Sequence, residues 1–427
     1  MDSLRKKTPS FDQGAQTQSD ASISSSEEFN IYFQSVQTKL IETLKGALHH
    51  SCIDLPSRDS IKELLNSPLN YELFRKMIPI KTKDDIFSNQ TQITKALSRL
   101  QQNPVTIIPS AGSSKGKLCF RIPNPEFEKK QFLSIAENLQ TAWNIDLNKT
   151  FFINAYPMGV HIPPLFNSME CSARPEIVSE AFQMVGTLFE SVVLIAQPHL
   201  LKYLIDFKLI DSSIADRLYI LSGGTQLHPN FSSYLSHHLG LTQDTFSHRI
   251  VSLFGAAEVG LGIGTGTIQE SGGNGIKEIV FRSNSEAYFL ECIDQKLIVT
   301  CLDPYKKIPI IRYATGDFIE PSTKNSAFSF KILGKNNLDK SFLLNSLSNN
   351  LFKHPDQFSL LTGAMELSEN TLYLQKYPDK LVNTSSLLEI IKKYFPIFEM
   401  TQLEIVNQLP KQKTYPLDFQ RKMILNG

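Results

Sequence analysis

The chain has 427 residues, of which 41% are hydrophobic and 20% charged, so it can bury a large core and is long enough for about three domains. Its formal net charge of +1 argues against a surface that binds nucleic acid by neutralising phosphates. No run of 18 apolar residues occurs, so no transmembrane helix is expected. The cysteines are odd in number and none are at metal-ligand spacing, which predicts reduced thiols in a cytoplasmic chain; they are Cys52, Cys119, Cys171, Cys292 and Cys301.

The first 30 residues are rich in Ser, Gln, Thr and Asp and lack the apolar core of a signal peptide. This composition predicts a disordered leader over 1–30, and a targeting or partner-binding signal is the alternative. From Ile31 to His50 the apolar residues recur at helical spacing, which predicts the first helix.

The middle of the chain alternates apolar β-type runs with helix-length segments. Strands are expected at 149–158, 191–197, 217–229 and 249–260, and helices at 174–190 and 199–208. Strands separated by helices make βαβ units, and repeated units predict a mainly parallel sheet.

From about residue 276 the pattern changes to short strands with close turns, which indicates an antiparallel meander or a distorted barrel. Beyond the hinge, placed near Lys335, strands are expected near 358–364 and 371–375 and a helix near 385–395. The predicted class is therefore α/β. A large domain over 31–333 would have mainly parallel sheets flanked by helices and a small distorted β-barrel. A small mobile α+β lid domain would follow over 334–427.

Four strand-to-loop segments carry residues that can bind a ligand. The first is "PSAGSSKGK" (109–117), where glycines, serines and lysines directly follow an apolar strand. Glycine lets backbone amides approach an anion, hydroxyls donate hydrogen bonds and lysine supplies charge, so the loop can cradle phosphate. The order of a Walker A loop is absent, and a flexible hairpin loop is the alternative.

The next two segments are "LSGGTQL" (221–227) and "SLFGAAEVG" (252–260). Backbone amides of the first could line an adenine or acyl pocket, or make a simple turn. In the second, Glu258 follows a strand and a glycine turn, where a carboxylate can hold Mg²⁺ on a nucleotide phosphate. Phe254 could stack on a purine, and a solvated glutamate in a turn is the alternative for Glu258.

The fourth segment is "IPIIRYATGDFIEP" (308–321), which looks like a strand running into a Thr-Gly turn that carries Asp317. Two interpretations remain open from the residues themselves. The segment is either a plain turn or a device that aims a carboxylate at the hydroxyls of a nucleotide.

The order of these four segments resembles the adenylate-forming superfamily of acyl-CoA synthetases and their relatives, and most of all its phenylacetate–CoA ligase branch. "MIPIKTKDDIF" (77–87) is similar to the Leu-Pro-x-x-Thr-Lys-x-Asp-Leu segment of that branch. "KLIVTCLDPYKKIPIIRYATGDF" (296–318) follows its strand-turn-strand ending in Thr-Gly-Asp, and "ILGKNNLDK" (332–340) its hinge. The resemblance covers roughly residues 50–427 and is most specific at Thr-Gly-Asp.

The resemblance implies a role for each matching position. The 109–117 loop would hold the ATP triphosphate, with Lys115 and Lys335 as the catalytic lysines. Asp317 would accept hydrogen bonds from both ribose hydroxyls, Glu258 would bind Mg²⁺, and His161 would contact the acid. The nucleotide-binding residues implied are Ser110, Gly112, Ser113, Ser114, Gly116, Lys117, Gly223, Gly224, Thr225, Phe254, Gly255, Ala256, Ala257, Glu258 and Asp317.

Several positions depart from the family pattern. Lys115 precedes Gly116 without the expected proline, Ala314 replaces a second arginine, and Asn337 replaces the hinge aspartate. Asp418 stands where relatives keep the lysine that meets the acyl phosphate, and a carboxylate there would repel that anion. Lysines could substitute only in a shifted register; they are Lys411, Lys413 and Lys422.

The sequence therefore predicts an AMP-forming acid–thiol ligase that uses ATP, Mg²⁺ and a small carboxylic acid, with CoA as the expected acceptor. A carrier protein as acceptor and a homodimer both stay open, and the acid itself is not specified. One alternative is a non-catalytic protein that binds nucleotide or acyl-adenylate, and another is an interaction protein tethered by its leader. The adjacent pairs His49–His50 and His237–His238 are interpreted as surface helix ends, since neighbours in sequence do not share a helix face.

Overall fold

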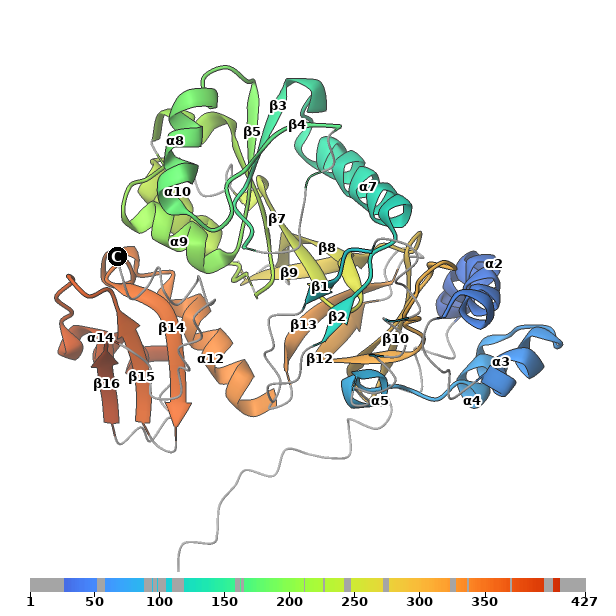
Figure 1. Cartoon of the computed structure of the whole chain (residues 1–427). Helices are drawn as coiled ribbons and strands as arrows, with labels where there is room; N and C mark the ends of the chain where they lie inside the picture. Colours follow the sequence, from blue (N-terminus) through green and yellow to red (C-terminus); the bar gives the residue numbers. More distant parts are fainter. Residues whose placement is uncertain are drawn as a thin grey trace, which may run out of the picture. The chain divides into compact units, whose positions relative to one another are not determined.

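The computed structural model (Figure 1) divides the chain into two compact units. The first unit is Met1–Gln101 with Ser285–Ile332, and the second is Gln102–Asn284 with Leu333–Gly427. Each unit is described by itself. The residues described are 27–51, 58–87, 94, 98, 105–109, 119–157, 162, 165–210, 212–225, 227–241, 247–271, 276–322, 328–335, 338–368, 371–394 and 402–407.

The first unit combines short helices with an antiparallel meander. Strand β11 pairs antiparallel with both β10 and β12, so of the two forms predicted after residue 276, a meander or a distorted barrel, these three strands form a meander. This unit ends at Ile332, inside strand β13 (Ser329–Lys335). Its other elements are α2 (Glu27–His50), α3 (Arg58–Leu65), α4 (Tyr71–Met77), α5 (Lys83–Phe87), β10 (Tyr288–Ile293), β11 (Lys296–Cys301) and β12 (Tyr313–Ser322).

Helix α2 packs on the meander through an aromatic cluster. The ring of Phe29 lies 4.8 Å from that of Tyr71, and the ring of Tyr32 lies 5.6 Å from that of Phe289. The Tyr32 hydroxyl accepts a hydrogen bond of 2.9 Å from the Leu290 amide. Because Phe29 is buried and the helix begins at Glu27, residues 27–30 belong to this helix rather than to the leader. Residues 1–26 lie outside the described part.

The second unit contains the predicted mainly parallel sheet, in the order β9-β8-β7-β6-β5-β3-β4. All pairs from β4 to β7 are parallel, and β7, β8 and β9 continue antiparallel. The strands are β3 (Thr150–Asn154), β4 (Asn167–Glu170), β5 (Ser191–Ala196), β6 (Leu218–Gly223), β7 (Ile250–Ala256), β8 (Gly260–Ser271) and β9 (Ile276–Ser283).

Helices cover this sheet, and three of them begin with proline at the first turn, where its missing N–H is harmless. The two helices predicted here are confirmed as α8 and α9. Helix α7, with 19 residues, was not predicted, and it buries Ile135, Leu139 and Trp143 in one cluster with residues of β3 and β5. The remaining elements of this region are α7 (Pro125–Trp143), α8 (Pro175–Val185), α9 (Pro198–Asp206), α10 (Phe231–Leu239), β1 (Ile108–Pro109), β2 (Phe120–Arg121), and the short 3-10 helices η1 (Leu147–Lys149) and η2 (Ser212–Arg217).

The rest of the second unit, residues 338–407, is the predicted α+β segment and is called the C-terminal part. Its three-stranded sheet has the order β14-β15-β16, with one antiparallel and one parallel pair. Its buried apolar residues share a core cluster with those of α9 and α10. The elements are α12 (Leu338–Leu351), α13 (Pro355–Phe358), β14 (Leu361–Ser368), β15 (Thr371–Lys376), α14 (Thr384–Tyr394) and β16 (Gln402–Val406).

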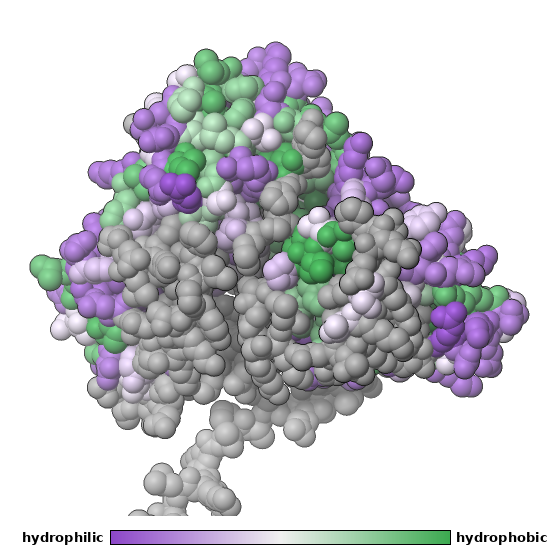
Figure 2. Space-filling model, viewed as in Figure 1, coloured by the Kyte–Doolittle hydropathy of each residue, from purple (hydrophilic) through white to green (hydrophobic). Residues whose placement is uncertain are grey.

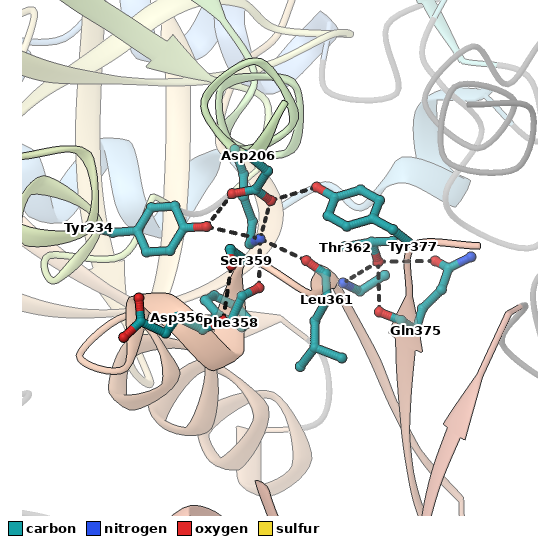
Figure 3. A network of polar contacts seen from close by, with 11 residues as sticks. Asp206, Tyr234, Asp356, Phe358, Ser359, Leu361, Thr362, Gln375 and Tyr377 are labelled. Atoms are coloured by element: carbon teal, nitrogen blue, oxygen red, sulfur yellow. Dashed lines mark hydrogen bonds and ion pairs between the residues drawn. The ribbon is translucent and has the colours of Figure 1, made fainter. Parts of the chain in front are cut away.

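A buried lysine joins the C-terminal part to α9; Figure 3 labels groups that surround it, among them Asp206, Phe358 and Leu361. Lys202 is 1% exposed, and its Nζ donates to the carbonyls of Phe358 at 2.9 Å and Leu361 at 2.7 Å. The same Nζ lies 2.5 Å from Asp206, which also accepts the Tyr377 hydroxyl at 2.8 Å. The lysine is thus surrounded by acceptors from both segments, as a buried charge requires.

The described surface facing the viewer in Figure 2 is mostly hydrophilic with scattered apolar areas. Large exposed apolar side chains include Met184, Leu188 and Leu381. Single residues of this kind are ordinary on protein surfaces. Among the described helices, none is long and apolar enough to cross a membrane.

Candidate nucleotide site

The carboxyl ends of β3, β5 and β6 lie at one edge of the parallel sheet, the usual place for a ligand in an α/β fold. Of the predicted residues, Gly223 is the last of β6, and Gly224 and Thr225 follow it and are exposed. Tyr156 and Gln197 follow β3 and β5 at the same edge. The sheet therefore brings these five residues together.

Gly224 is held tightly against its neighbours at this edge. Its φ is +82°, and a Cβ there would lie 2.0 Å from the Tyr156 hydroxyl and 2.7 Å from the Gln197 amide nitrogen. Only glycine combines this backbone conformation with so close an approach. Burial raises the pKa of Tyr156, whose hydroxyl is hydrogen-bonded to Gln197, so the phenol is neutral. Sequence reasoning missed Tyr156 and Gln197, and their only local signal is that each follows a buried strand.

Glu258 lies at the tip of a β-hairpin. Phe254, Gly255 and Ala256 are the last residues of β7, and the turn 257–259 leads directly into antiparallel β8. The predicted position of Glu258 just beyond a strand is confirmed, but Gly255 lies in the strand and not in the turn. Glu258 is half-buried, and the ring of Phe254 meets that of Phe281 edge-on at 6.1 Å.

Arg121 connects this hairpin tip to the predicted phosphate loop. It is 2% exposed, its Nε donates to Glu128 at 2.8 Å, and its Nη1 donates to the Ala257 carbonyl at 3.0 Å. Strands β1 and β2 pair antiparallel and so bring together Pro109 and Phe120, the two residues that flank segment 110–119. Arg121, which follows Phe120 in β2, is bonded to Ala257, the residue before Glu258.

The loop side chains themselves fall outside the described residues, as do those of several other predicted positions. His161 and Asp418 also lie outside them, and Lys335 is described only as the last residue of β13. Their roles stay predictions. The loop residues concerned are Ser110, Gly112, Ser113, Ser114, Lys115, Gly116 and Lys117.

Asp317, in the first unit, lies inside strand β12, so the turn predicted there is wrong. Tyr313 and Ala314 pair with Val299 and Ile298, but the next pair is Phe318 with Lys296. Residues 315–317 therefore face Leu297 alone, which makes a β-bulge. Gly316 has φ +81°, the conformation that favours glycine at such a site.

The bulge holds the Asp317 backbone through a local hydrogen bond. The Asp317 amide donates to the Thr315 hydroxyl oxygen at 3.1 Å, and that hydroxyl donates to the Leu297 carbonyl at 3.3 Å. Asp317 itself is 3% exposed. Asp317 and Glu258 belong to different units, so their meeting in one cleft stays a prediction.

The described part of the chain offers few side chains that could together bind a metal ion. It contains no group of three or more His, Cys, Asp or Glu side chains that could hold an ion. Glu258 alone is enough where phosphate oxygens and waters complete the shell, as is usual for Mg²⁺. His49, His50 and His237 are exposed at helix ends, as interpreted. His238 is an exception, because it is half-buried and its ring lies 4.6 Å from that of Tyr234.

No family model and no curated protein matches the sequence. The structure is similar to the GH3.15 acyl acid amido synthetase, with 13% identity and a TM-score of 0.51 over 89% of this chain and 87% of that one. AtGH3.15 in complex with 2,4-DB matches with 13% identity and a TM-score of 0.47, over 86% of each chain. Apo MatB from Rhodopseudomonas palustris matches with 12% identity and a TM-score of 0.43, over 75% of this chain and 70% of that one.

At such identities a structural likeness establishes the fold and not the activity, and the first of these matches carries that conclusion. The phenylacetate–CoA ligase branch stays a prediction from sequence. The mixed sheet, its flanking helices and the α+β C-terminal part belong to a fold shared with the GH3.15 acyl acid amido synthetase.

Proposed function

We propose that this chain is an ATP-dependent ligase that activates a carboxylic acid as its acyl-adenylate. The observation that carries the proposal is the 3.0 Å hydrogen bond from Arg121 to the Ala257 carbonyl. It joins Arg121, which follows a segment rich in serine, glycine and lysine, to Ala257, which directly precedes Glu258. Such a loop suits a triphosphate, and Glu258 suits the Mg²⁺ that accompanies it.

In the first step, a carboxylate oxygen of the acid attacks the α-phosphorus of ATP. The bond to the β-phosphate oxygen breaks, giving acyl-AMP and pyrophosphate. Ser113, Ser114 and Lys115 would donate hydrogen bonds and charge to the phosphates, and Glu258 would hold Mg²⁺, which neutralises phosphate charge when bound. The protein acts by positioning and electrostatic stabilisation and forms no bond to the substrate itself.

The nucleoside would lie along the sheet edge and the bulge. Backbone groups of Gly223–Thr225 and the ring of Phe254 would meet the adenine, and Asp317 would accept both ribose hydroxyls. Because Asp317 is only 3% exposed, the ribose can reach it only after the covering chain moves. We therefore expect ATP binding to change amide exchange in β12.

In the second step, an acceptor attacks the acyl carbon and AMP leaves. CoA is the acceptor that the sequence favours, and an amine is a second candidate, since the similar structure is an acyl acid amido synthetase. Rotation of the C-terminal part about Lys335 would separate Lys202 from the Phe358 and Leu361 carbonyls, unless α9 moves with it. The second step then either breaks this buried contact or proceeds with the C-terminal part in place.

The alternative is a protein that binds nucleotide without turning it over, because Asp418 stands where relatives keep a catalytic lysine. The test is exchange of labelled pyrophosphate into ATP, across aryl, fatty and amino acids, followed by CoA or amines as acceptors. Exchange that depends on one acid supports the ligase. If ATP raises the melting temperature without any exchange, the alternative is supported. If there is neither exchange nor a change in melting temperature, both the ligase and the alternative are contradicted.

A third reading, an interaction protein tethered by the leader, is separated by one truncation. Removing residues 1–26 keeps all of α2 (Glu27–His50). If the truncated chain changes its location in the cell but keeps its chemistry, the leader is a tether. If both stay unchanged, the leader has neither role.

A further inference from the structure

Arg312, five residues before Asp317, is the centre of a buried polar cluster in the first unit. It is 2% exposed, and its Nε and Nη2 each donate to Glu291 at 3.0 Å. Its Nη1 donates to the carbonyls of Arg75 at 2.9 Å and Ile78 at 2.5 Å. This planar fork is geometry that only arginine provides.

The partner carboxylate is satisfied as fully as the guanidinium. Glu291 is 1% exposed and also accepts the Tyr71 hydroxyl at 3.2 Å. Burial raises the pKa of Glu291, and Arg312 opposes that rise. Burial and Glu291 raise the pKa of Tyr71, so the phenol stays a neutral donor. A pair bonded this completely fixes one geometry for the chain segments that it joins.

The backbone of Arg312 is held on both sides as well. Its amide donates to the Thr300 hydroxyl at 3.0 Å and its carbonyl accepts from the Lys81 amide at 2.8 Å. The Ala314 amide in turn donates to the Lys81 carbonyl at 2.8 Å. Arg312 has φ +48°, a conformation rare outside glycine that persists only where surrounding contacts impose it.

Arg312 directly precedes the strand that carries Asp317. Strand β12 begins at Tyr313, and its regular pairing with β11 is interrupted after Ala314 by the bulge 315–317. A shift of one residue at the start of a strand would turn every later side chain to the opposite face. The place where β12 begins therefore sets the direction in which Asp317 points.

We propose that Arg312 is a positioning residue for Asp317: through Glu291, Thr300 and Lys81 it fixes the start of β12 and thereby aims the carboxylate at the ribose diol. This rests on the proposed function, which assigns the diol to Asp317. Arg312 does not contact the nucleotide in this account. Its loss should therefore weaken recognition of the diol and leave recognition of the phosphates intact.

The test compares ATP with 2′,3′-dideoxy-ATP, which lacks both ribose hydroxyls, by calorimetry on the full chain. The wild type should prefer ATP by about tenfold or more, since hydrogen bonds to a charged acceptor are worth that much. Arg312→Lys, Glu291→Gln and Thr300→Val should each reduce the preference at least threefold. Val36→Ala, at a buried site on α2 in the same unit, should lower the melting temperature without changing the preference.

The outcomes separate the positioning role from the assignment of the diol. If Asp317→Asn abolishes the preference while Arg312→Lys and Thr300→Val retain it, the positioning role is overturned and the ligase proposal stands. If the wild type binds ATP without any preference, or Asp317→Asn keeps it, the diol assignment fails and the positioning role fails with it. Should Arg312→Lys not fold, Thr300→Val decides, because it keeps the guanidinium pair and removes only the backbone contact.

Discussion

Lys202 and Asp206, one turn apart on α9, form an ion pair of 2.5 Å whose side chains are 2% and 0% exposed. The pair lies where α9 meets the C-terminal part (Figure 3). Water cannot screen or replace such a contact, so its two charges depend on each other and on the surrounding carbonyl and hydroxyl groups.

Lys202→Met should lower the free energy of unfolding by about 3–5 kcal/mol, because it leaves Asp206 buried without its cation. The double variant with Asp206→Leu should recover much of that loss. Lys39→Met is the control, since Lys39 pairs with Glu286 at the surface, where a pair contributes at most about 1 kcal/mol. Urea denaturation measures all of them. Equal losses of unfolding free energy in Lys202→Met and Lys39→Met would contradict the role given to the buried Lys202–Asp206 pair.

Gly224→Ala tests the close approach at the sheet edge. The variant should lose about 1–2 kcal/mol for the left-handed backbone and about 1–3 kcal/mol more for overlap with Tyr156. Gly240→Ala is a matched control, because Gly240 has φ +69° and open space where a Cβ would stand. Tyr156→Phe removes the hydroxyl nearest to that Cβ and should rescue part of the loss in Gly224→Ala. Additive effects in this double-mutant cycle would show that the two residues are not in contact.

Arg121→Lys should weaken the connection between the phosphate loop and Glu258, because lysine cannot bond Glu128 and the Ala257 carbonyl with one planar group. We expect a rise in KM for ATP of about tenfold, equivalent to ~1.4 kcal/mol. Arg174→Lys is the matched control, since Arg174 pairs with Glu176 at the surface. Pyrophosphate exchange with varied ATP measures both. An unchanged KM in Arg121→Lys would mean that the contact does not shape the ATP site.

His228 predicts a loss of stability in acid. Burial, with nearby His199, lowers the pKa of His228 from 6.5 to about 4. The unfolded chain therefore binds a proton between these values that the folded chain does not, and stability falls as pH decreases from 6.5 toward 4. The loss should reach up to about 3 kcal/mol. Urea midpoints between pH 7 and pH 4 should fall less in His228→Gln than in the wild type, while His237→Gln, at an exposed site, should follow the wild type.

Local patterns were enough to predict much of the fold. Strands β5 and β6 are largely apolar runs, and helix α2 has a regular apolar stripe. The strands and this helix could therefore be recognised in the sequence. Helix α7 was missed because charged and amide side chains are interspersed with apolar ones along it, and only a few positions face the core. The bulge at Thr315–Asp317 was read as a turn, since Thr-Gly-Asp suits either structure.

The residues that support the site could not be predicted, because their partners are distant in sequence. Arg312 bonds the Arg75 carbonyl across 237 positions, and Arg121 bonds the Ala257 carbonyl across 136. The apolar residues on either side of each arginine are compatible with burial, but they do not identify the distant carbonyl that each one bonds. Only the folded chain shows that both are buried and aimed at backbone carbonyls.

The most direct test of the central claim is a structure of the full chain with ATP and Mg²⁺. The account predicts that one ATP contacts both units, with Asp317 within about 3.2 Å of both ribose hydroxyls and Glu258 facing the phosphates. An ATP bound elsewhere, or held by Glu258 while Asp317 stays buried and away from the ribose, would contradict it.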